Sequence, residues 1–182
     1  MGSIYEKCIS SYPQMLFIAL LILCHVYKIS YAYAFGYLVN VPINLGLKLL
    51  FRAIIGDAGN RPIPYHAINT FATFDTFVKL VSPTTIRNAD AYGFPSGHAQ
   101  TVGYFVAFAH QFLPWRTWHI TYIIAVLFIA LLLMYTRIAF RRHTAVQVLF
   151  GFAFGVAVFR AFHLVFHWDL CYTPLRLIFH TA

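Results

Sequence analysis

Five apolar stretches dominate this chain and restrict its fold more than any other feature. They lie at about residues 14–27, 31–55, 98–113, 118–140 and 144–166, separated by polar or turn-forming residues. Apolar segments of this kind are typical of helices that cross a bilayer, where the backbone must satisfy its own hydrogen bonds. We therefore predict an all-α fold, a polytopic transmembrane bundle of about five spanning helices that forms a single domain over residues 1–182.

Composition favours the same class of protein. Of the 182 residues, 60% are hydrophobic and only 10% are charged, which is too few to solvate a globular surface of this size. The net charge is +8, but no run of lysines and arginines resembles a nucleic-acid patch. We expect an integral, multi-pass membrane protein whose partners are the lipid bilayer and a phosphorylated lipid, with no nucleic acid.

The segment between the second and third stretches lacks a span. Within residues 65–81, apolar side chains recur at helical spacing, with Asp75 and Lys79 on the opposite side. This pattern predicts an amphipathic helix that lies at the membrane interface.

The stretch Gly93-Phe94-Pro95-Ser96-Gly97-His98 predicts a turn that opens a helix, with Ser96 as its N-cap. The unpaired N–H groups and the dipole at such a helix start favour a phosphate oxygen.

Two glycines in the fifth stretch predict close helix packing. Gly151 and Gly155 are four residues apart, a small-xxx-small spacing that lets another helix approach.

The alternation of five crossing helices predicts which polar residues meet. The end of the second helix, the start of the third, the end of the fourth and the start of the fifth would share one side, which brings together Arg61, His98, Arg137 and His143. Arginines and backbone amides can hold phosphate oxygens while one histidine attacks phosphorus and another protonates the leaving oxygen. Carboxylates are nearly absent, so we expect no metal site and no cofactor.

Three short motifs then resemble a known family. Arg61-Pro62, Pro95-Ser96-Gly97-His98, and Thr136-Arg137 followed by His143 match in order the three-part signature of the type 2 phosphatidic acid phosphatases, membrane relatives of the vanadium haloperoxidases. The resemblance covers the chain from about Lys48 to Gln147.

This resemblance implies metal-independent hydrolysis of a phosphate monoester or pyrophosphate on a membrane lipid. His143 would be the nucleophile that forms a phosphohistidine, and His98 the general acid. Phosphate would be bound by Arg61, Arg137, Ser96 and Gly97. Two alternatives stay open: a lipid phosphotransferase, and a catalytically weak or inactive member that binds anionic lipid.

The chain departs from the family pattern at three positions. At one of them, Thr136 stands where serine is usual and keeps the hydroxyl. Ile54 stands where the family has a lysine seven residues before the first arginine, so either Lys48 or Arg52 would fill that substrate-binding role. Gln147 stands where the family has an aspartate that orients the nucleophile. An amide can accept the same hydrogen bond but carries no charge. We expect either a weakened orienting pair or replacement by another acid, such as Asp57 or Asp90.

Overall fold

The computed structural model describes residues 11–62, 92–112 and 119–166, and these residues form five α-helices and one short 3-10 helix. In chain order the elements are α2 (Tyr12–Val26), α3 (Ala32–Ile55), η1 (Gly56–Gly59), α6 (Gly97–Phe112), α7 (His119–Ala139) and α8 (Ala145–Phe166). Each α-helix coincides with one predicted apolar stretch to within a few residues. The all-α class is therefore confirmed for the described residues.

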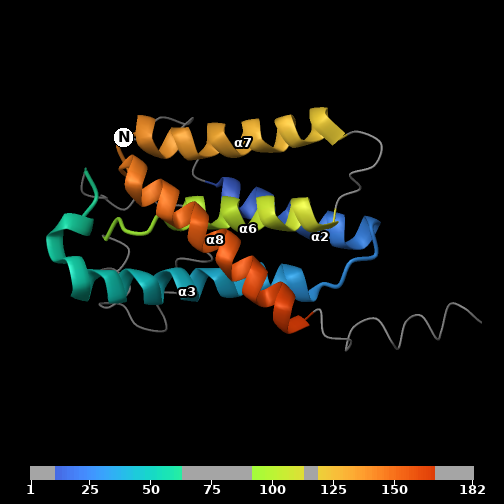
Figure 1. Ribbon diagram of the computed structural model, residues 1–182, viewed down its shortest axis with the longest axis horizontal. Helices are drawn as coiled ribbons and strands as arrows, with labels where there is room; N and C mark the ends of the chain where they lie inside the picture. Colours follow the sequence, from blue (N-terminus) through green and yellow to red (C-terminus); the bar gives the residue numbers. More distant parts are fainter. Residues whose placement is uncertain (1–10, 63–91, 113–118, 167–182) are drawn as a thin grey trace, which may run out of the picture.

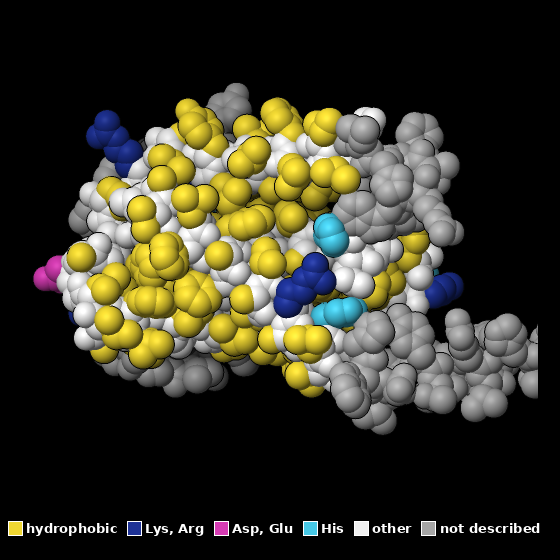
Figure 2. Space-filling view, viewed as in Figure 1, with side chains coloured by type: hydrophobic (Ala, Val, Ile, Leu, Met, Phe, Trp, Pro, Cys, Tyr) yellow, Lys and Arg dark blue, Asp and Glu magenta, His cyan; other side chains and the backbone are white. Residues whose placement is uncertain are grey.

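Length and composition support fewer membrane-crossing helices among the described residues than the five expected. Among the described residues, two helical segments are long and apolar enough to cross a membrane, Ala32–Gly59 and Ala145–Phe166, whereas Tyr12–Val26 and Ile123–Ala139 are shorter apolar helices. The prediction of about five spans is thus not confirmed. On the face shown in Figure 2, hydrophobic side chains are widespread and charged side chains are few, which suits a protein associated with a membrane. The predicted interfacial helix lies outside the described residues.

Helices α6 and α8 approach each other closely because glycines line their contact. A Cβ atom at Gly151 would collide with the backbone of Ser96, and one at Gly155 with the backbone of Gln100. From the other side, a Cβ at Gly103 would collide with the backbone of Phe152. The predicted small-xxx-small packing is confirmed, and α6 and α8 form the scaffold that fixes the Ser96 turn.

We expect Gly151→Ala to destabilise the protein and to lower phosphate affinity, because the new methyl group must displace the Ser96 backbone. Overpacking of this kind costs about 1–3 kcal/mol of unfolding free energy. The matched control is Gly46→Ala in α3, where nothing lies within 4 Å of the added Cβ. Thermal unfolding in detergent, followed by phosphate titration, compares the two variants. Equal behaviour would show that the α6–α8 contact tolerates the methyl group.

The predicted site residues gather at one end of the bundle. Figure 1 shows the end of α3, the start of α6, the end of α7 and the start of α8 together on the left side of the view, with α8 crossing obliquely in contact with α6. This is the arrangement that alternation of the helices predicts, and it places the candidate site at the ends of four helices.

Candidate active site

Backbone pairing brings Arg61 to the site. The residues after η1 lie antiparallel to the segment before α6, through a bridge between Asn60 and Tyr92 and a hydrogen bond of 3.1 Å from the Gly93 N–H to the Gly59 carbonyl. The Tyr92 hydroxyl adds a bond of 3.0 Å to the Gly56 carbonyl. These contacts hold Arg61 next to the Gly93–Ser96 turn.

Helix α6 begins at the predicted turn, but one residue earlier than expected. The Ser96 hydroxyl accepts a hydrogen bond from the Ala99 N–H at 3.4 Å, which is the N-cap arrangement. The backbone N–H of Ser96 donates to the backbone carbonyl of Gln147 at 3.0 Å, so the Ser96 turn is attached to the first turn of α8. Ser96 is fully buried.

His143 lies in the short connection between α7 and α8. Its backbone N–H donates to the backbone carbonyl of Arg137 at 3.1 Å, which folds the connection back over the end of α7. Both side chains are buried, with exposed fractions of 2% for His143 and 3% for Arg137. The Nη1 atom of Arg61 lies 3.5 Å from Nε2 of His143.

The Gln147 amide has one possible orientation. Its nitrogen donates to the carbonyls of Gly59 and Asn60, at 3.1 and 2.9 Å, and its Oε1 accepts from the Thr144 N–H at 3.1 Å. The Thr144 hydroxyl accepts in return from the Gln147 N–H at 3.3 Å, which completes a capping box at the start of α8.

This amide orientation fixes the tautomer of His143. Its Nδ1 lies 3.3 Å from Gln147 Oε1 and 3.0 Å from the Gly93 carbonyl oxygen, and both partners can only accept. Nδ1 therefore carries the proton. The lone pair is on Nε2, which faces the Arg61 guanidinium, a group that can only donate.

Burial holds the pKa of His143 well below its usual value, and nearby positive charges add to the effect. In decreasing order, these charges belong to Arg61, Lys48, Arg137 and His98. The neutral imidazole is therefore the form present near neutral pH. An anion bound among the same cations would offset their charge and raise the pKa again.

We expect imidazole NMR of isotopically labelled protein to find His143 neutral from neutral pH down to below 6.5, the usual pKa of histidine. Saturating inorganic phosphate should move the titration upward, because the bound anion stabilises the imidazolium. Exposed His110 at the other end of α6 provides the control, and its imidazole signals should be the same with and without phosphate. If phosphate leaves the pKa of His143 unchanged, the anion binds elsewhere.

The structure brings together most of the residues that the sequence suggests. Arg61, Ser96, His98, Arg137, His143 and Gln147 meet at one end of the bundle, and Gly97 begins α6 against the Asn44 side chain. Lys48 is buried, with an exposed fraction of 5%, and its charge acts on His143. Arg52 is exposed, and its charge acts on Tyr92 instead.

The two acids considered as replacements for the family aspartate have different positions. Asp57 is the only acidic residue among the described segments; it is exposed and accepts a hydrogen bond from Asn60 at 3.0 Å. Asp90 lies outside the described residues. Gln147 itself therefore occupies the position next to His143 Nδ1.

Three buried amides that the sequence did not point to hold the Ser96 turn on the side facing α3. Asn44 donates to Gln100 Oε1 at 2.7 Å and to the Pro95 carbonyl at 3.4 Å, and Gln100 donates to Asn40 Oδ1 at 2.7 Å. All three amides are buried. The available signal was the i, i+4, i+8 spacing of Asn40, Asn44 and Lys48 within an apolar stretch, which places them on one face of α3.

Fold and site together define an all-α protein with a buried histidine next to a cluster of cationic groups. The profile of the PAP2 superfamily matches residues 30–170, and the chain therefore belongs to this superfamily, as the three motifs predict. Members of the superfamily are phosphatases, which supports activity on a phosphorylated substrate. No curated protein and no solved structure matches the chain.

Proposed function

We propose that the protein hydrolyses a phosphate monoester or pyrophosphate carried by a membrane lipid, without a metal ion, through a phosphohistidine intermediate. The observation that carries the proposal is the state of His143: Nδ1 is held by two acceptors, and the Nε2 lone pair faces the cationic groups that would bind phosphate. Membership of a phosphatase superfamily supports it.

In the first step, Nε2 of His143 attacks phosphorus and the bond from phosphorus to the lipid oxygen breaks. His98 gives its proton to that oxygen, so that the lipid leaves as an alcohol, or as a lipid phosphate when the substrate is a pyrophosphate. Phosphorylation of Nε2 leaves a positive ring whose Nδ1–H still points at Gln147 Oε1 and the Gly93 carbonyl. The charges of Arg61, Lys48 and Arg137 would stabilise the equatorial oxygens in the transition state.

In the second step, water attacks the phosphohistidine and neutral His98 takes one of its protons. Inorganic phosphate leaves, and both histidines return to their starting forms. The cycle therefore balances in protons and charge.

The test uses purified protein in mixed micelles with a 32P-labelled lipid phosphate. Free labelled phosphate, together with an acid-labile and base-stable phosphoprotein, is the expected result. Label on a second lipid would identify a phosphotransferase. Binding of the lipid with neither product across pH 5 to 8, a range that brackets the usual histidine pKa of about 6.5, would identify an inactive member and contradict the proposal.

A further inference from the structure

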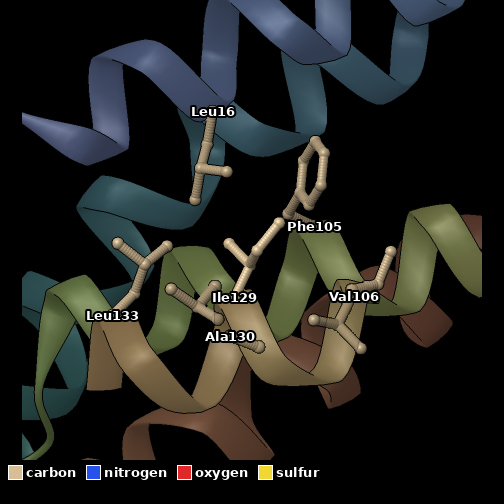
Figure 3. A pocket seen from close by; sticks show the side chains of 8 residues that line it. Leu16, Phe105, Val106, Ile129, Ala130 and Leu133 are labelled. Carbon is tan, nitrogen blue, oxygen red and sulfur yellow. The ribbon is translucent and has the colours of Figure 1, made fainter. Parts of the chain in front are cut away.

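An apolar cavity lies between α2, α6 and α7, close to the candidate active site. Its lining is entirely apolar and includes Leu16 of α2, Val102, Phe105 and Val106 of α6, and Ala130 and Leu133 of α7. In Figure 3, Leu16 points from α2 toward the side chains of Ile129 and Leu133 on α7, with Phe105 and Val106 of α6 beside them. The cavity measures about 50 Å³.

On each of the three helices, a polar residue of the candidate site lies one helical turn away from an apolar residue that lines the cavity. The pairs are Tyr12 with Leu16, His98 with Val102, and Arg137 with Leu133. Four residues of α-helix advance by about 6 Å. The cavity therefore begins about one helical turn below the polar residues, on the side of His98.

Tyr12 marks the boundary between the polar site and the cavity. Its ring packs edge-on against His98, with ring centroids 5.2 Å apart, and the charge of Arg137 acts on its hydroxyl. The side chain is 4% exposed, and the hydroxyl has no hydrogen-bond partner among the described residues. A buried hydroxyl in this position is a donor for an oxygen of a bound molecule.

We infer that this cavity holds the hydrocarbon chain next to the leaving oxygen of the substrate. The inference rests on the proposed function, because in-line displacement puts the leaving oxygen opposite His143 and next to His98. A chain attached to that oxygen then lies on the His98 side, where the cavity begins. Tyr12 would donate to an oxygen at the junction of phosphate and chain.

The shape of the cavity defines the chemical class of its occupant. Its floor is buried, with exposed fractions of 2% for Val102 and 3% for Ala130, whereas Ile129 at its edge is 52% exposed. A chain can therefore enter sideways from the membrane. The volume is well below the roughly 150 Å³ of a cavity that takes benzene, so it fits a short length of a linear chain and excludes a ring.

The first experiment measures binding without turnover. Dodecyl phosphate with a photoreactive diazirine at the fourth carbon is bound to the full chain in detergent, irradiated, and the labelled peptides are mapped. We expect label on residues 102–106 of α6 and 126–133 of α7, reduced by unlabelled dodecyl phosphate. Label confined to α3 and α8 would overturn the inference.

The second experiment compares hydrolysis of dodecyl phosphate with that of ethyl phosphate, whose chain is too short to reach the cavity. Ala130→Leu fills the cavity, and we expect the ratio of kcat/KM for the two substrates to fall about tenfold, the effect of excluding roughly two methylene groups. Ala125→Leu, the same change at an exposed position of α7, should leave the ratio unchanged.

The two experiments separate the inference from the proposed function. If the native protein hydrolyses neither alkyl phosphate but the diazirine labels the cavity, the proposed function fails and the binding site stands. If both are hydrolysed, the ratio is unchanged in Ala130→Leu and the label lies elsewhere, the proposed function stands and the binding site fails. If Ala130→Leu does not fold, labelling of the native protein still decides.

Discussion

A His143→Asn variant is expected to release phosphate at no more than the background rate from any substrate, whatever its leaving group. Asparagine is close to histidine in size and can keep a hydrogen bond to the Gly93 carbonyl, but it offers no nucleophilic nitrogen. The neutral imidazole of His143 has its Nε2 lone pair facing Arg61, and the asparagine side chain supplies no such lone pair in that position. The phosphoprotein trapped from the native chain should be absent from the variant.

His98→Asn should give a different pattern in kcat/KM, which reports the steps up to departure of the leaving group, because a general acid matters there only when the leaving oxygen needs a proton. The kcat/KM for dodecyl phosphate should fall by about 10²- to 10⁴-fold, the usual contribution of acid–base catalysis. The kcat/KM for p-nitrophenyl phosphate should fall far less, since nitrophenolate leaves without a proton.

The control for both variants is His110→Asn. His110 is exposed near the other end of α6, so its loss should leave both substrates unaffected. An equal loss of kcat/KM on both substrates in His98→Asn would mean that His98 binds phosphate or supports the fold, and would remove it as the acid. Activity in His143→Asn would remove His143 as the nucleophile.

The sequence was sufficient to predict the helices and the meeting of the principal site residues. Long apolar stretches locate helices because they have few other stable structures in lipid, and alternation of the chain direction brought Arg61, His98, Arg137 and His143 to one end. This prediction does not depend on how many of the helices cross the membrane, since the same connections hold in any antiparallel bundle. For that reason the site is as expected, although the count of five spans is not confirmed.

The residues that support the site could not be predicted in the same way, because their roles depend on contacts between distant segments. The pairing of Asn60 with Tyr92 is a single bridge and leaves no alternating pattern in the sequence. Spacing alone left Lys48 and Arg52 equivalent, and only the orientation of α3 separates them. The burial of Tyr12 against His98 likewise depends on how α2 packs.

Gln147 shows most clearly what the structure adds. From the sequence alone, Gln147 is an uncharged substitute for an aspartate. In the structure its oxygen faces His143 and Thr144, while its nitrogen binds the carbonyls of Gly59 and Asn60, directly before Arg61. One amide therefore joins His143 to the segment that carries Arg61. A carboxylate could accept the first two hydrogen bonds but could not donate the other two.

We therefore expect Gln147→Glu to lower kcat/KM, even though it adds the negative charge that the family pattern contains. The carboxylate would face two buried carbonyl oxygens, and losing both donor bonds costs about 2 to 3 kcal/mol, a decrease of roughly 30- to 150-fold if the loss falls on the transition state. Gln147→Asp should lose at least as much, because the shorter side chain also weakens the capping box. Gln111→Glu, which keeps an acceptor for Arg160 far from the site, is the matched control.

The His143 titration distinguishes a positioning role for Gln147 from a purely structural one. A new carboxylate next to Nδ1 should raise the pKa of His143, so a folded Gln147→Glu protein with a raised His143 pKa and reduced turnover would show that lost alignment outweighs gained charge. If the same variant instead hydrolyses lipid phosphate faster than the native chain, the missing charge limits this enzyme, and the tether to Gly59 and Asn60 contributes little to catalysis.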